Sequence, residues 1–302
     1  MVAVYQHRPT NKGGYMSLLR DRMLRDMERA GLALRTREHY IGAIRQMTRF
    51  LKRPPEELSA DDIRAWDDEM ERRGNSPQWK AIHVAALLFL YRRTLGRPEM
   101  VSFLSFRKQR RKLPVVLGQE EAFRLLAAIC EPRLRVFYTL IYDTGLRITE
   151  AARLKAGDID HARGVIHVRA GKGSKPRQVK LSDRLYEILR DYWRDVRSWG
   201  PHPEPLTRDS LVFANRRGGP LSFDSARKAL ALAARVAGIT RRVTPHCLRH
   251  SYATAQLEAG VDLRVLQAQL GHAGLNSTQV YLHVSTRLIR RAPSPLDSLP
   301  PP

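Results

Sequence analysis

Apolar residues return every three or four positions through residues 13–105. This spacing puts them on one face of an α-helix, so it predicts amphipathic helices. A serine opens one of the segments, as expected of an N-cap. The pattern predicts a bundle of roughly four helices. Their segments are YMSLLRDRMLRDMERAGLA, REHYIGAIRQMTRFL, SADDIRAWDDEMERRG and WKAIHVAALLFLYRRTLG.

In residues 115–291, segments with the hydrophobic periodicity of helices alternate with segments that have the periodicity of strands. GVIHVRA and RQVKL alternate apolar and polar residues around GKGSKP, which predicts two strands joined by a turn. We therefore expect a mainly α protein with a small β-sheet, in which a mixed α+β domain follows the bundle, and a Pro-rich tail at 292–302. Helical spacing marks LGQEEAFRLLAAI, RLRVFYTLIYDTG, LRITEAARL, LSDRLYEILRDYWRDVRS, SFDSARKALALAARVAG, TPHCLRHSYATAQLEAG, DLRVLQAQLG and STQVYLHVSTRLI.

Charge gives the first functional clue. The 302 residues hold 53 Lys and Arg against 30 Asp and Glu, a net charge of +23, and residues 106–302 carry +17 of it. Such an excess favours a polyanionic partner, and nucleic acid is the first candidate. A membrane surface is the alternative, but the longest apolar run, within AIHVAALLFLYRR, is too short to span a bilayer.

The N-terminal segment and the cysteines indicate the compartment. MVAVYQHRPTNKGG lacks the apolar stretch of a signal peptide, so export by that route is not expected. Cys130 and Cys247 are too few for a disulfide framework or a multi-cysteine zinc site. We expect a cytoplasmic protein, associated with the nucleoid if DNA is its partner.

Residues 106–114 form a basic linker between the two domains. Five of the six positions 107–112 are cationic, and Pro114 discourages a continuous helix. A solvated tether is one interpretation, but so dense a run beside a basic domain favours contact with a DNA backbone. The candidate DNA contacts are Arg107, Lys108, Arg110, Arg111 and Lys112, with Lys175 and Arg177 of the hairpin.

The stretch TPHCLRH is predicted to begin a helix. Thr244 suits the N-cap and Pro245 the first helical position. His246 and Arg249 then lie near free backbone N–H groups at the positive end of the helix dipole. This setting favours binding of a phosphate.

His250 lies four positions after His246, on the same helix face, and the pair raises the alternative of a metal site. No glutamate follows His246 as in HExxH, and Arg249 beside the pair would repel a metal ion. We therefore expect no metal. For His250 a purely structural role and a supporting role in the site both remain open.

A nucleophile could follow in LGHAGLNSTQVYLHV. Gly271 is expected to end a helix and to leave His272 in a loop, and Asn276 or Ser277 to cap a further helix that carries Tyr281. A tyrosine on such a helix is usually a core or interface residue. As a nucleophile it needs a base or a cationic site, because a phenol is only about one part in a thousand ionised at neutral pH.

Further cations come from DTGLRITEAARL and the hairpin. Arg147 follows a glycine turn and is expected to start a helix capped by Thr149. Glu150 is an ordinary capping carboxylate or orients a neighbouring group. Residues 162–182 contain no Asp or Glu, and Lys172 lies between two glycines at the turn. Such a lysine is usually solvated, but it could protonate a leaving oxygen.

The motifs TGLRITE, GKGSKPR, TPHCLRH, LQAQLGH and STQVYLHV resemble, in this order, those of the tyrosine recombinases, the phage-integrase family, and most of all its Xer-type and integron-type members. The resemblance covers about residues 115–285, and segment 13–105 is similar in size to the family's core-binding domain. It implies a site-specific recombinase that acts on double-stranded DNA as a homo-tetramer on two sites, without metal or ATP.

The resemblance also implies how the reaction proceeds. Tyr281 would attack a DNA phosphodiester, forming a 3′-phosphotyrosyl link and freeing a 5′-hydroxyl. His246 would help the proton leave the tyrosine, and Lys172 would protonate the departing oxygen.

The remaining roles concern the phosphate. Arg147 and Arg249 would hold its non-bridging oxygens, and His272 would add a hydrogen bond. The chain departs from the family after Tyr281. Members often carry a helix there that docks into a neighbouring subunit, whereas here STRLIRRA precedes a Pro-rich end, so exchange of this segment between subunits stays open.

Three other functions share some of these features. A type IB topoisomerase would use the same chemistry to relax DNA. A DNA-binding regulator could keep the fold without catalysis, but none of the six catalytic positions is lost. A basic RNA-binding protein would be expected to carry an RNP-type aromatic strand or a GXXG clamp, and neither is found.

If the basic linker lies along DNA, Lys112→Ala weakens DNA binding and flattens its salt dependence, because one phosphate contact is lost. DNA cleavage at low salt persists. The measurement is the binding constant across a salt series, and an unchanged slope would remove the linker from the interface.

Overall fold

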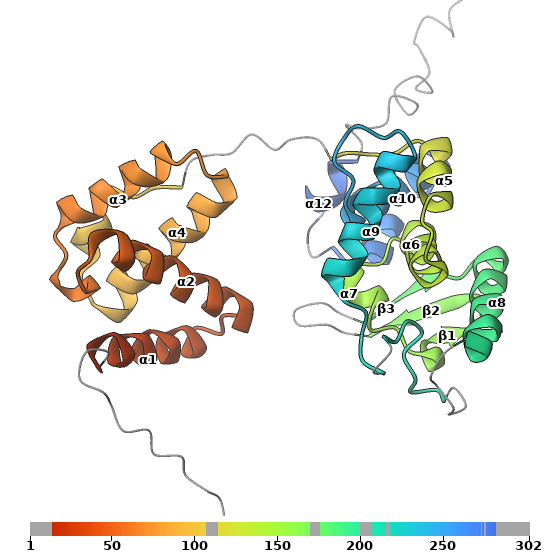
Figure 1. The fold of residues 1–302 in the computed structure, drawn as a ribbon, viewed down its shortest axis with the longest axis horizontal. Helices are drawn as coiled ribbons and strands as arrows, with labels where there is room; N and C mark the ends of the chain where they lie inside the picture. The colour runs from red at the N-terminus through yellow and green to blue at the C-terminus, as the bar shows by residue number, and fades with distance from the viewer. Residues whose placement is uncertain are drawn as a thin grey trace, which may run out of the picture. The chain divides into compact units, whose positions relative to one another are not determined.

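A computed structural model of the chain describes residues 14–106, 114–169, 176–199, 207–215, 218–272, 274 and 276–281. The chain divides into two compact units, with the boundary between Arg111 and Lys112. Figure 1 shows a first unit made of helices and a second in which helices surround a small sheet. The expected class, mainly α with a small β-sheet, is confirmed.

The first unit contains the four helices expected from the pattern. Ser59 and Asp62 form a capping box at the start of the third helix, because the Asp62 N–H donates to the Ser59 hydroxyl at 3.2 Å. Trp66 and His83 are buried in the core that the helices share. The helices are α1 (Gly14–Arg29), α2 (Leu34–Leu51), α3 (Ala60–Arg72) and α4 (Pro77–Phe89), with the short 3-10 helices η1 (Pro55–Glu57) and η3 (Pro98–Val101) and the π-helical segment η2 (Leu90–Thr94).

The second unit packs helices against a three-stranded antiparallel sheet, in the order β1, β2, β3. The two predicted strands are present, and Ile166 pairs with Val179 with both side chains in the core. The strands are β1 (Ile159–Asp160), β2 (Val165–Val168) and β3 (Arg177–Lys180). The helices are α5 (Gln119–Ala127), α6 (Pro132–Thr144), α7 (Ile148–Ala151), η4 (Ala156–Asp158), α8 (Asp183–Trp199), α9 (Phe223–Val236), α10 (Pro245–Glu258), α11 (Leu263–Leu270) and α12 (Asn276–Gln279).

Three local expectations were wrong. Strand β1 was missed because it has two residues, too few to show a period. Thr149 is not the cap of α7, because Arg147 is the N-cap residue and the helix starts at Ile148. Tyr281 does not lie on α12, which ends at Gln279; the Tyr281 N–H donates to the Thr278 carbonyl in a turn.

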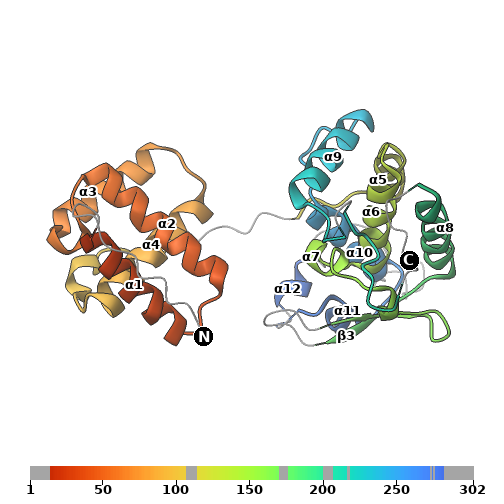
Figure 2. The same cartoon turned by 60° about the horizontal axis from the view of Figure 1, so that its bottom comes forward.

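Helices α6 and α10 pack side by side, and this contact sets the position of the residues at the ends of both helices (Figure 1 and Figure 2). Gly145 caps α6 in the left-handed conformation, with a φ of 65°. A Cβ atom at this position would lie 2.4 Å from Cδ1 of Tyr252 on α10. Glycine is therefore required here both for the turn and for the close approach of the two helices.

Gly145→Ala should lower the free energy of unfolding of the second unit by about 3 kcal/mol, because left-handed strain adds to overpacking. Gly238→Ala is the matched control. Gly238 also has a positive φ, of 71°, but nothing lies within 4 Å of a Cβ there. Only strain remains in the control, at about 1–2 kcal/mol. Urea unfolding followed by circular dichroism measures both, and equal losses would contradict the steric argument.

Candidate active site

The N-terminal half of α10 carries three of the predicted site residues. Thr244 is the N-cap and Pro245 the first helical residue, as expected. Arg249 is buried, with 3% of its surface exposed. Its Nη1 donates to the Gly145 carbonyl at 2.5 Å and its Nη2 to the Leu270 carbonyl at 2.6 Å. The guanidinium is therefore fixed between the C-terminal ends of α6 and α11.

Arg147 lies at the start of α7 and contacts the same region from another side. Its Nη2 donates to the Gly271 carbonyl at 3.0 Å and its Nη1 to Oε1 of Glu150 at 2.8 Å. Glu150 also accepts from the Arg147 backbone N–H at 2.8 Å, so both predicted possibilities hold: it caps α7 and it orients a neighbouring guanidinium. A guanidinium has five N–H groups, which leaves others on Arg147 for a ligand.

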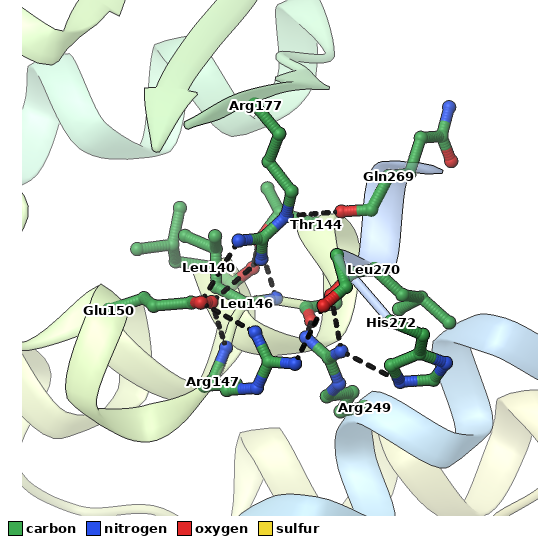
Figure 3. A network of polar contacts seen from close by, with 12 residues as sticks. Leu140, Thr144, Leu146, Arg147, Glu150, Arg177, Arg249, Gln269, Leu270 and His272 are labelled. Carbon is green, nitrogen blue, oxygen red and sulfur yellow. Dashed lines mark hydrogen bonds and ion pairs between the residues drawn. The ribbon is translucent and has the colours of Figure 1, made fainter. Parts of the chain in front are cut away.

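Arg177, predicted as a DNA contact, is paired with groups of the protein itself. Its side chain is only 7% exposed, and its guanidinium forms a two-pronged ion pair with Glu150, with N–O distances of 2.9 and 2.7 Å. The Nε atom donates to the Gln269 carbonyl at 2.6 Å. Figure 3 shows Arg147 and Arg177 on the Glu150 carboxylate, and Arg249 beside Leu270 and His272 at the end of α11. This burial could not be predicted from the sequence, because the exposure of one strand position cannot be read from a cationic hairpin.

His272 follows the glycine that ends α11, as expected. Its Nε2 lies 3.1 Å from Nη2 of Arg249 and its Nδ1 2.9 Å from the Thr278 hydroxyl. Arginine can only donate, so Nε2 accepts and Nδ1 carries the proton. Burial, with the positive charge of Arg249, lowers the pKa of His272 to about 4, and the ring is neutral at pH 7.

Tyr281 is buried, with 1% of its surface exposed, and its hydroxyl lies 3.0 Å from Nδ1 of His250. The resemblance assigned the contact with the tyrosine proton to His246, whereas the hydrogen bond joins the tyrosine to the histidine one helical turn further along. Burial, followed by His246 and Arg249, lowers the pKa of His250 to about 4. The ring is therefore neutral at pH 7 and can accept a proton.

The electrostatic environment of Tyr281 has two opposing contributions. Burial raises the pKa of the phenol, while the charges of Arg249 and Arg147 lower it. Burial also lowers the pKa of His246, with the same two arginines adding to the effect. The site is therefore cationic through its arginines, and its imidazole rings stay neutral.

Several predicted residues lie outside the described part of the chain. These are Lys172, Lys175, Arg107, Lys108, Arg110, Arg111 and Lys112. Of the eight predicted catalytic and supporting residues, the other seven are described. Hydrogen bonds link Arg147 with Glu150, Arg249 with His272 and His250 with Tyr281, and both arginines donate to the end of α11.

Sequence reasoning missed the acceptors that hold the arginines. They are consecutive backbone carbonyls at the end of α11, and the Gly271 cap is the only sequence signal for such a helix end. The role of the Thr278 hydroxyl was also missed, and a threonine two residues into a short helix gives no distinct signal.

The described residues also bear on metal binding and on membrane insertion. Within them, no group of three or more His, Cys, Asp or Glu side chains is arranged to hold a metal ion. None of the helices described is long and apolar enough to cross a bilayer.

Solved structures share this fold. The XerH site-specific recombinase, in a post-cleavage complex with a palindromic difH substrate, superposes with a TM-score of 0.70 at 25% identity, over 89% of this chain and 82% of that one. A lambda integrase dimer bound to a COC′ core site gives a TM-score of 0.70 at 18% identity, over 88% and 94%, which supports the fold alone.

Sequence comparisons extend the similarity to both units. The protein y4qK of Sinorhizobium fredii is 36% identical over 289 residues, 95% of this chain and 91% of that protein. Tyrosine recombinase XerC of Bacillus pumilus is 34% identical over 265 residues, 83% and 87% of the two chains. Residues 19–99 match the phage integrase N-terminal SAM-like domain, and residues 116–287 match the phage integrase family. This chain therefore belongs to the phage integrase family, the family of the site-specific tyrosine recombinases.

Proposed function

We propose that this protein cuts and rejoins double-stranded DNA at specific sites through a 3′-phosphotyrosyl intermediate on Tyr281. The observation that carries the proposal is the environment of that hydroxyl. It lies 3.0 Å from the neutral imidazole of His250; burial raises its pKa, and the positive charges of Arg249 and Arg147 oppose part of that rise. A phenol in this setting has a proton acceptor, and the phosphate it attacks has two guanidinium partners.

The first step transfers two protons and exchanges one bond at phosphorus. Tyr281 gives its proton to Nδ1 of His250, and its oxygen attacks phosphorus. The P–O5′ bond breaks as the O–P bond forms, and Lys172 donates a proton to the departing 5′ oxygen. Arg147 and Arg249 stabilise the charge on the non-bridging oxygens, because a guanidinium donates in pairs and stays protonated.

His246 and His272 would complete the site around the phosphate. His246 lies one turn before His250 on α10, with the two ring centroids 6.4 Å apart. His272 accepts from Arg249, and a bound phosphate would take over that guanidinium N–H. The imidazole could then turn its own N–H toward the phosphate oxygen.

The second step reverses the first with the hydroxyl of another strand. The phosphotyrosyl link conserves the energy of the phosphodiester, so the proposed reaction needs neither ATP nor a metal ion. Exchange of strands between two DNA sites requires several subunits, and we propose a homo-tetramer that works at the nucleoid. The basic linker, residues 106–114, would contact the DNA backbone.

Tyr281→Phe should abolish formation of the covalent complex on a nicked suicide substrate, because the phenylalanine ring has no nucleophilic oxygen. Denaturing gel electrophoresis detects the complex as a shifted protein band. The band should form equally in EDTA, and Tyr142→Phe on α6 is a matched control that should retain it. Cleavage by Tyr281→Phe, or a requirement for Mg²⁺, would refute the mechanism.

The same preparation separates recombination from topoisomerase activity. Incubation with two labelled DNA molecules should yield products that join strands of both. A change in the linking number of a plasmid, with no such products, would instead indicate a type IB topoisomerase.

A substrate with sulfur in place of the bridging 5′ oxygen separates the two proton transfers. A thiolate leaves without a general acid, so Lys172→Ala should be slow on ordinary DNA and recover most of the lost cleavage rate on the 5′-thio substrate. His250→Gln should stay slow on both, because the nucleophile still has to lose its proton. Rates of covalent-complex formation measure this, and recovery by His250→Gln alone would reverse the two assignments.

A further inference from the structure

We propose that Arg177 is a positioning residue of the active site, which neutralises Glu150 and thereby leaves the charge of Arg147 available to the DNA phosphate. The inference rests on the proposed function, since it concerns the same site. Arg177 itself contacts no substrate in this scheme. It acts through the carboxylate and through the end of α11 (Figure 3).

The Glu150 carboxylate is shared between two arginines. Oε1 accepts from Nη1 of Arg147 at 2.8 Å and from Nη1 of Arg177 at 2.9 Å. Oε2 accepts from the Arg147 backbone N–H at 2.8 Å and from Nη2 of Arg177 at 2.7 Å. The carboxylate side chain is only 12% exposed, so these four hydrogen bonds replace water around it.

The charges of the three groups decide what each contact does. Two guanidinium groups and one carboxylate give a net charge of +1. Arg177 forms a bidentate ion pair with the Glu150 carboxylate, which suits the geometry of both groups better than the single side-chain contact of Arg147. Without Arg177, Glu150 would pair with Arg147 alone, and the sum would be zero at the position where a phosphate is to bind. Attraction between opposite charges at this distance is strong in a half-buried site.

The exposed fractions of the two arginines fit this division of roles. The side chain of Arg147 is 32% exposed, against 7% for Arg177. Every nitrogen of the Arg177 guanidinium has a protein acceptor: Nη1 and Nη2 on Glu150, and Nε on the Gln269 carbonyl. Arg147 is therefore the arginine that a ligand can reach, and Arg177 is buried and contacts the Glu150 carboxylate that Arg147 also contacts.

Arg177 also holds the end of α11 against the site. Gly271 lies against it, since a Cβ on that glycine would come within 3.0 Å of Cδ of Arg177. The carbonyls of Leu270 and Gly271 follow directly after the Gln269 carbonyl and accept from Arg249 and Arg147. Because Arg177 is the first residue of β3, it ties these acceptors to the sheet.

The test compares variants that separate charge from hydrogen bonding at position 177. Arg177→Lys keeps the positive charge, and Arg177→Gln keeps a hydrogen-bond donor but no charge. Glu150→Gln is combined with Arg177→Gln in a double variant. Lys180→Gln is the matched control, because it removes one cation from the exposed end of the same strand. Each full-length protein is assayed for melting temperature, DNA affinity and the single-turnover rate of covalent-complex formation at saturating DNA.

We expect Arg177→Gln to slow the rate at saturating DNA by about 10- to 100-fold, since misplaced catalytic groups carry costs of this size. DNA affinity should change little. Arg177→Lys should cleave faster than Arg177→Gln. The double variant should recover much of the lost rate, because removing the carboxylate restores the net charge at Arg147. Lys180→Gln should match the unmodified protein.

Three results would overturn the proposal. The first is a wild-type rate for Arg177→Gln. The second is a double variant as slow as Arg177→Gln, which would indicate a purely structural role. The third is weakened DNA binding with a salt slope lowered by about one and an unchanged rate at saturation, which would make Arg177 a DNA contact.

The proposal can still be tested if Arg177→Gln is unfolded at the assay temperature. If Arg177→Gln melts below the assay temperature, the double variant, which lacks the unpaired carboxylate, is compared with Arg177→Lys and with Glu150→Gln. The proposal then requires the double variant to cleave at about the rate of Glu150→Gln, because without the carboxylate Arg177 has no charge to neutralise. A slower double variant contradicts it. Failure of the unmodified protein to form a Tyr281-dependent complex would refute the proposed function instead.

Discussion

Three consecutive backbone carbonyls at the C-terminal end of α11 accept hydrogen bonds from three different arginines. Gln269 accepts from Arg177, Leu270 from Arg249 and Gly271 from Arg147. Guanidinium groups brought this close repel one another, and the repulsion grows as water is excluded. The C-terminal end of a helix carries a partial negative charge, so it offsets part of this cost. One carboxylate, that of Glu150, offsets more, and the site retains the excess positive charge that a phosphate requires.

Burial and the same positive charge together affect the protonation of the neighbouring groups. His250 and His272 have pKa values near 4, because burial and the arginines both disfavour a charged ring. Burial raises the pKa of the Tyr281 phenol, and the charges of Arg249 and Arg147 oppose part of that rise. The protonated phenol of Tyr281 is therefore a proton donor that already contacts a proton acceptor, the neutral imidazole of His250. The concentration of arginine thus serves the nucleophile as well as the phosphate.

Hydrophobic periodicity and the residues that cap helices were sufficient to predict most of the helices and strands. Thr244 and Pro245 correctly marked the start of α10, and Gly271 the end of α11. The two-residue strand β1 has no period to detect, and the short α12 ends before its expected length. The spacing of His246 and His250 puts both on one helix face, so the sequence alone could not show which of them contacts the tyrosine. Only the tertiary contact between α10 and the turn after α12 distinguishes them, and it joins His250 to Tyr281. For the same reason the burial of Arg177 could not be read from a hairpin rich in cations.

The three acceptors on α11 also limit how this part of the chain can vary in length. Asp262 caps the start of the helix and Gly271 its end, with eight helical residues between them. Inserting or deleting one residue there would turn every later carbonyl by about 100° around the helix axis and shift it by about 1.5 Å. The three guanidinium groups come from α7, β3 and α10, so they could not follow such a turn together. Substitutions on the exposed face of α11 are compatible with the site, whereas a change in its length would disconnect all three arginines at once.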